Sequence, residues 1–114
     1  MFDFEKLDVY AKAKSFNHHI LNFLNKSKID KTTYDQLRRA SLSIMLNIAE
    51  GSGRFTKPDK RNFYVIARGS VFECVAIFDF LKDMNIINEE TYNKFYSSLE
   101  EISKMLFSLI KNLQ

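Results

Sequence analysis

The sequence is poor in the residues that break or bend regular structure. Its 114 residues include three glycines and one proline. Because β-hairpins and tight turns depend on these residues, their scarcity disfavours β-sandwiches and barrels and indicates long, uninterrupted elements. Hydrophobic residues make up 46% of the chain, more than a disordered chain carries. The length suits one domain, residues 1–114.

Cysteines and long apolar runs are also scarce. The one cysteine, Cys74, has no partner for an internal disulfide and lies in an apolar helical pattern. We therefore expect it to be a small core residue in a reducing, cytoplasmic setting. No apolar run approaches the ~20 residues that span a bilayer, and the first residues lack the pattern of a signal peptide. The sequence predicts no contact with a membrane.

Apolar residues recur every three or four positions in four segments, which is the spacing of one helical face. The segments run from about Leu7 to Leu24, from Thr33 to Glu50, for about 26 residues after Thr56, and onward from the N-cap Asn88. Connections of roughly 5–8 residues favour antiparallel neighbours. The predicted fold is all-α, an antiparallel up-down-up-down four-helix bundle. The stripes expected to face its core are Val9, Ala13, Phe16, Ile20 and Phe23; Leu37, Ala40, Ser41, Ile44, Met45 and Ile48; Phe63, Ala67, Ser70, Cys74, Ile77, Leu81 and Met84; and Tyr92, Phe95, Leu99, Ile102, Leu106, Leu109 and Leu113.

Polar and glycine residues indicate where the middle helices begin and end. Thr32 with Asp35 resembles a capping box at the start of the second helix. Thr56 should accept a hydrogen bond from the backbone N–H of Asp59 at the start of the third. Gly51 is placed to close the second helix in the left-handed conformation, where a side chain would cost energy.

Positive charge is concentrated in the middle of the chain. The net charge is +3, yet all five arginines lie between residues 38 and 68. This clustering indicates a polyanion or an acidic protein patch as partner, and the alternative is a solvated surface with internal ion pairs. One basic group, Arg38 and Arg39, should lie at the start of the second helix, and a second group should lie in the loop and first turns that follow it. The two groups would then be about 24 Å apart. The candidate nucleic-acid-binding residues are Arg38, Arg39, Arg54, Lys57, Lys60 and Arg61.

Other residues near these cations allow two interpretations each. Phe55 could stack on an unpaired base or plug the end of the bundle. Arg38 or Arg39 could form an ion pair with Glu73 across helices, which would remove one arginine from any binding site.

The stretch from Asn47 to Arg54 joins a helix to the cationic loop. Asn47 and Glu50 are three residues apart on one helical face, where we expect them to hold the N–H groups of the loop. They belong to a predicted structural corner where the second and third helices meet. The corner comprises Asn47, Glu50, Gly51, Ser70 and Glu73.

Patterns typical of catalysis or metal binding are not evident. The adjacent His18 and His19 point about 100° apart on a helix and cannot chelate a metal as a pair. The loop after Gly51 lacks the Lys-Ser/Thr of a phosphate-binding loop, and no histidine is evident as a base for the serines. The sequence predicts no enzyme, no cofactor and no metal site.

The third segment carries a second apolar stripe, offset from the first and formed by Phe72, Ala76 and Phe80. A helix in a monomeric bundle needs one buried face, so the second stripe is a candidate subunit interface. The alternative is that these residues widen the core or are exposed singly.

Several blocks together resemble a known family. They are Phe4 to Ala13, Arg39-Ala40-Ser41, Asn47 to Gly51 with Arg54, and Phe63 to Ser70 with Glu73. In order and spacing they resemble the four-helix-bundle proteins encoded in intervening sequences of bacterial 23S ribosomal RNA genes, also described as S23 ribosomal proteins. The chain is similar as well to the accessory variability determinant of diversity-generating retroelements.

The resemblance implies an antiparallel bundle that forms a homopentamer. It also implies a basic surface that binds nucleic acid and a partner such as a reverse transcriptase or a ribosomal component. The predicted function is therefore that of a non-enzymatic, oligomeric accessory protein that binds RNA or DNA. The alternative is a protein-interaction adaptor, or a structural protein of the intervening element, without a nucleic-acid ligand.

Overall fold

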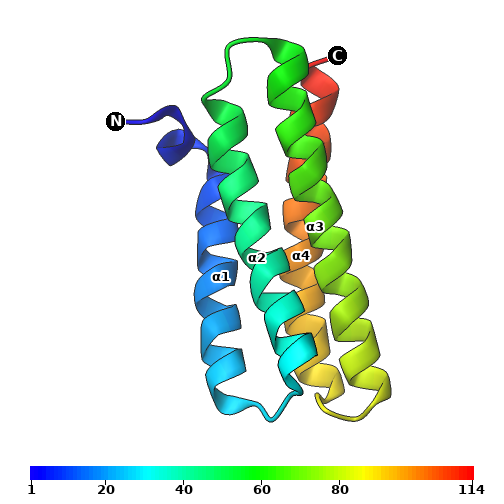
Figure 1. The fold of residues 1–114 in the computed structure, drawn as a ribbon. Helices are drawn as coiled ribbons and strands as arrows, with labels where there is room; N and C mark the ends of the chain where they lie inside the picture. Colours follow the sequence, from blue (N-terminus) through cyan, green and yellow to red (C-terminus); the bar gives the residue numbers. More distant parts are fainter.

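The computed structural model describes all 114 residues, and its only regular elements are helices. A short 3₁₀ helix, η1 (Asp3–Lys6), precedes α1 (Asp8–Lys26), α2 (Lys31–Ser52), α3 (Lys57–Asp83) and α4 (Glu89–Asn112). The α1–α2 and α3–α4 connections lie at one end of the bundle, and the α2–α3 connection lies at the other end with both termini (Figure 1). The predicted all-α fold with four long helices is confirmed. None of these helices combines the length and the hydropathy needed to cross a bilayer.

One hydrophobic core runs along the bundle, to which all four helices contribute. Helices consecutive in the chain pack together, and α4 closes against α1. The predicted stripe of α4 is confirmed, with Leu99, Ile102 and Leu106 fully buried. Aromatic rings pack together in the core toward the α3–α4 connection, where Phe78 stacks on Phe95 with ring centroids 4.5 Å apart. The single cysteine, Cys74, is buried as expected, and burial raises the pKa of its thiol to about 12.

The buried face of α3 is rotated by one position from the predicted stripe at several places. Tyr64 and Phe78 are buried, whereas their predicted neighbours Phe63 and Ile77 are only half-buried, and Met84 is exposed. The prediction was wrong at these positions because apolar residues stand side by side in the sequence there. Periodicity alone does not decide which of two adjacent apolar residues faces the core.

Side-chain caps set where the helices begin. The predicted cap of α3 is confirmed, since Thr56 Oγ1 accepts the backbone N–H of Asp59 at 3.3 Å. The predicted capping box at Thr32 is wrong. Helix α2 begins earlier, after Asp30, whose carboxylate accepts the N–H of Thr33 at 3.1 Å.

Gly51 does not terminate α2 in a left-handed conformation. The helix continues to Ser52, and no glycine in the chain has a positive φ. A Cβ atom on Gly51 would lie 2.9 Å from the Cβ of Phe63 and 3.0 Å from the ring of Tyr64. Gly51 is therefore required by the close approach of α2 and α3 and not by a turn.

Candidate nucleic-acid interface

The predicted basic residues fall in two different environments. Arg54, Lys57, Lys60 and Arg61 gather at the α2–α3 connection, around the start of α3. Arg38 and Arg39 were expected at the start of α2, but that helix begins at Lys31, so they lie two turns inside it. The structure thus brings together only the group at the α2–α3 connection.

Arg38 is half-buried and makes a polar contact that the sequence analysis missed. Asn17 is buried on α1, and its side-chain amide donates hydrogen bonds to the backbone oxygens of Ala13 and Ser41, the latter at 2.7 Å. Arg38 Nη1 lies 3.5 Å from Asn17 Oδ1. The signal available in the sequence was a polar residue four positions after Ala13 and three before Ile20, inside the apolar stripe. Arg38 therefore contributes to contacts between α1 and α2, while its neighbour Arg39 is exposed.

The predicted ion pair between Glu73 and Arg38 or Arg39 does not form. The ion pairs in the structure are Lys12–Glu101, Lys31–Asp35 and Arg54–Glu50. Glu73 is exposed. It lines a groove toward α2, beside Thr32, Thr33 and Gln36, and meets no cation there.

Four residues at the α2–α3 connection differ in how available their charges are. The Arg54 guanidinium lies over the Phe63 ring, 4.5 Å from its centroid, and Nη2 is 3.5 Å from Glu50 Oε1. Lys60 Nζ donates a 2.8 Å hydrogen bond to the backbone oxygen of Ser52 at the end of α2. Lys57 and Arg61 are exposed and form no ion pair. These two are the cations best placed to meet a ligand.

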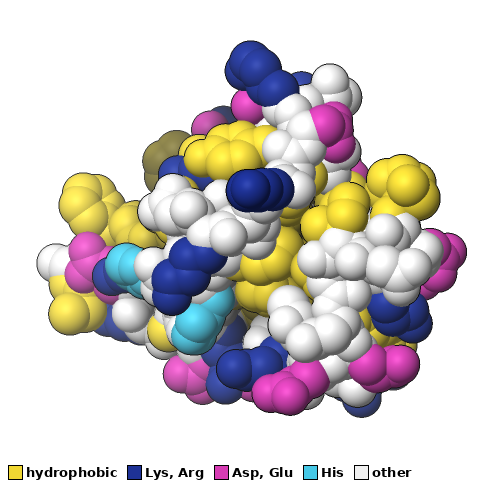
Figure 2. Space-filling view, turned by 90° about the horizontal axis from the view of Figure 1, so that it is seen from below, with side chains coloured by type: hydrophobic (Ala, Val, Ile, Leu, Met, Phe, Trp, Pro, Cys, Tyr) yellow, Lys and Arg dark blue, Asp and Glu magenta, His cyan; other side chains and the backbone are white.

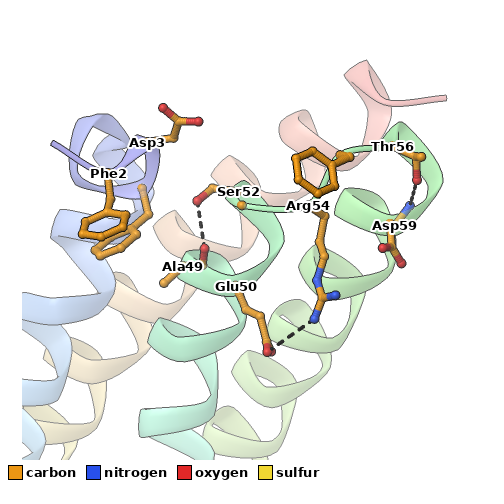
Figure 3. Close-up of a pocket in the computed structure, with 11 residues that line it drawn as sticks. Phe2, Asp3, Ala49, Glu50, Ser52, Arg54, Thr56 and Asp59 are labelled. Carbon is orange, nitrogen blue, oxygen red and sulfur yellow. Dashed lines mark hydrogen bonds and ion pairs between the residues drawn. The ribbon is translucent and has the colours of Figure 1, made fainter.

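A hollow of about 530 Å³ lies between η1 and the α2–α3 connection, and Arg54 is the one of the four cations that lines it. Phe2, which immediately precedes η1, lies on one side of the hollow, and Arg54 of the connection lies on the other (Figure 3). Phe55 also lines the hollow, and its side chain is fully exposed. The interpretation of Phe55 as a plug over the bundle end is therefore wrong, because its ring packs on nothing.

The residues of the predicted corner have other partners than expected. Asn47 donates to Ser43, and the Ser43 hydroxyl lies 2.9 Å from the Ser70 hydroxyl. The N–H groups of Gly53 and Arg54 are held by backbone oxygens of α2 and not by the side chains of Asn47 or Glu50. Asn47 and Ser70 thus help to join α2 to α3 through Ser43.

The opposite end of the bundle has a mixed surface. Viewed from the side of the α1–α2 and α3–α4 connections, Lys and Arg side chains are interspersed with acidic, histidine and apolar side chains (Figure 2). One of its lysines, Lys31, is paired with Asp35 at 2.9 Å. A polyanion would meet alternating charges there, which makes the α2–α3 end the better candidate interface.

Comparisons with known proteins agree with this bundle. The family model of the 23S rRNA-intervening sequence protein matches residues 5–108. The chain belongs to this family. Among solved structures, it is similar to a protein of unknown function from the S23 ribosomal protein family of Bacteroides thetaiotaomicron. The two share 28% sequence identity with a TM-score of 0.85, over 90% of this chain and 98% of that chain. No curated protein matches the chain significantly.

The predicted resemblance to the 23S rRNA intervening-sequence family is thereby confirmed. The similarity extends from the end of η1 to within the last turns of α4, so it includes the candidate interface.

Proposed function

We propose that the protein is a non-enzymatic, cytoplasmic accessory protein that binds nucleic acid through the α2–α3 end of an antiparallel up-down-up-down bundle. The observation that carries the proposal is that Lys57 and Arg61 are exposed, form no ion pair, and lie close in sequence to the fully exposed ring of Phe55. Lysine and arginine bind phosphates irrespective of sequence. An exposed aromatic ring adds a surface on which an unpaired base can stack. The ligand class is therefore RNA or DNA with unpaired bases.

Reversing the charge at Lys57 and Arg61 should reduce this binding. We expect Lys57→Glu with Arg61→Glu to weaken the affinity for a labelled single-stranded oligonucleotide by at least about tenfold at low salt, because two phosphate contacts become repulsive. Fluorescence anisotropy measures the affinity across a salt series. Since each phosphate contact on a single strand contributes about 0.7 to the slope of log affinity against log salt, the slope should become shallower by roughly 1.4.

The matched control makes the same charge change at the other end of the bundle. Lys26 and Lys28 are exposed near the α1–α2 connection, and Lys26→Glu with Lys28→Glu should leave the salt slope unchanged. Equal losses in both variants would mean that net charge alone governs binding, and the proposed interface would be wrong.

The ring of Phe55 should contribute without affecting the salt slope. Loss of one base stack costs about 1–3 kcal/mol, so Phe55→Ala should weaken binding to a single strand by roughly 5–150-fold. Duplex of the same length should bind equally to both proteins, because its bases are already stacked. An unchanged affinity for the single strand would remove Phe55 from the site.

We also infer that the protein forms a homo-oligomer, with a pentamer favoured by the family resemblance. The observation in support is that Phe72 and Phe80 are 57% and 53% exposed, so the second apolar stripe does not widen the core. A surface of this kind is typical of an interface. The same stripe also favours the adaptor alternative, in which a reverse transcriptase or ribosomal component docks there. Such binding would depend far less on salt than binding to phosphates.

A further inference from the structure

Helix α3 presents a continuous apolar strip to solvent, here called the outer face. Phe72 and Phe80 are more than half exposed, and Val65 is 46% exposed. Their spacing along the helix places them on one side, over a length of about 22 Å. The outer face comprises Val65, Gly69, Phe72, Ala76 and Phe80.

Gly69 lies in the middle of this outer face, and nothing within the chain requires a glycine there. No heavy atom lies within 4 Å of the position that a Cβ on Gly69 would occupy, in contrast to Gly51. Its φ is not positive. Glycine is a poor helix former, so an exposed glycine in the interior of a 27-residue helix has no internal explanation. Between the bulky Val65 and Phe72 it leaves a recess that suits the close approach of another molecule.

One flank of the outer face, facing α4, carries an arginine without a partner. The Arg68 guanidinium lies over the rings of Phe72 and Phe107, at 4.8 and 5.6 Å. Arg68 Nε is buried and makes no hydrogen bond, and Arg68 belongs to none of the ion pairs. Buried polar atoms nearly always have a partner. The residue as a whole is not enclosed, since Arg68 lines an open groove of about 610 Å³ between α3 and α4. An acceptor from another molecule can therefore approach its guanidinium from that groove.

The other flank, facing α2, carries the complementary charge. Glu73 is exposed, pairs with no cation, and lines a separate, smaller groove between α2 and α3 with Gln36 and Phe80. Arg68 and Glu73 are five residues apart on opposite sides of the outer face, about 7.5 Å along the axis. The chain thus has an unpaired cation and an unpaired anion on either side of one apolar strip.

We propose that a second copy of this chain docks its outer face into the α3–α4 groove, and that its Glu73 carboxylate accepts hydrogen bonds from Arg68. The inference rests on the proposed self-association and specifies its geometry. The outer face and the groove share Phe72 and Ala76, but half of the groove lining comes from α4, which contributes nothing to the outer face. The two surfaces that meet therefore differ, so the contact is head-to-tail. Each copy offers Arg68 to one neighbour and Glu73 to the other, and repetition of the contact generates assemblies larger than a dimer.

Charge reversal at both positions tests the proposal. Native mass spectrometry and light scattering should show the unmodified protein as an assembly larger than a dimer. Arg68→Glu and Glu73→Arg should each weaken association by at least tenfold, because each creates a pair of like charges. The double variant, Arg68→Glu with Glu73→Arg, should restore assembly, since it re-forms the pair with the charges exchanged. Recovery of this kind is not expected from residues that act only on the fold of one copy.

A second variant tests the recess without changing any charge. Gly69→Leu should fold with unchanged helix content, because a side chain there meets no atom of its own chain, and it should also weaken association at least tenfold. Circular dichroism on the same samples reports the fold.

The outcomes separate the two proposals. A monomer at all concentrations would overturn self-association itself. An assembly that both single variants and Gly69→Leu leave intact would preserve self-association and overturn the head-to-tail contact. A dimer as the only assembled form would also overturn the head-to-tail contact.

Discussion

Phe78→Ala should lower the free energy of unfolding by about 3–5 kcal/mol, as is usual for a buried aromatic residue whose removal leaves a cavity. Phe78 is 1% exposed, and its ring stacks on Phe95 at 4.5 Å and contacts Phe23 at 5.8 Å. These rings come from three helices, so little of the cavity can close without shifting a helix. A loss of this size is a large part of the roughly 5–15 kcal/mol that stabilises a typical domain.

Denaturant unfolding followed by circular dichroism measures this loss at one fixed protein concentration. Phe55→Ala is the matched control, since it removes the same atoms from a fully exposed side chain and should change stability by no more than about 0.5 kcal/mol. Similar losses in the two variants would show that the core is not organised around Phe78.

Gly51→Ala should destabilise the protein by about 1–3 kcal/mol, the usual cost of overpacking a close contact. The sign is the informative part, because replacing glycine by alanine inside a helix normally stabilises it by about 1 kcal/mol. At Gly51 the new methyl group would meet the Cβ of Phe63 at 2.9 Å, an atom close to the backbone that cannot rotate away. The substitution therefore forces α2 and α3 apart.

Gly53→Ala provides the control two residues further along the chain. There the nearest atom to the new methyl group is the backbone oxygen of Glu50 at 3.6 Å, an ordinary contact. We expect stability within about 0.5 kcal/mol of the unmodified protein. If Gly51→Ala were the more stable of the two variants in the same unfolding experiment, the close approach of α2 and α3 would be wrong.

The sequence predicted the helices well because their signals are local. The three-and-four spacing of apolar residues fixed the existence of each helix, and Thr56 and Asn88 gave the starts of α3 and α4. The role of Gly51 was not predictable in the same way. A glycine at a helix end and a glycine at a helix–helix contact look alike in sequence, and only the position of Phe63 on α3 separates them.

The sequence predicted which cations lie near the candidate interface, but it did not predict which of them make contacts within the chain. The clustering of cations is visible in one dimension, and it identified Lys57 and Arg61 correctly as residues near the α2–α3 connection. Whether a cation already has a hydrogen-bond partner within the chain depends on residues distant in sequence, such as Asn17 beside Arg38. The unpaired state of Arg68 and Glu73 likewise follows from where α3 directs its side chains.

The position of the two termini has a practical consequence. Both chain ends lie at the end of the bundle that carries the α2–α3 connection (Figure 1). A purification tag or fluorescent protein fused to either terminus would hang over the surface through which binding is proposed, and a polyhistidine tag would add charge there. The α1–α2 connection, at residues 27–30, faces away from that surface. It is therefore the better place to insert an epitope or to attach the protein to a sensor.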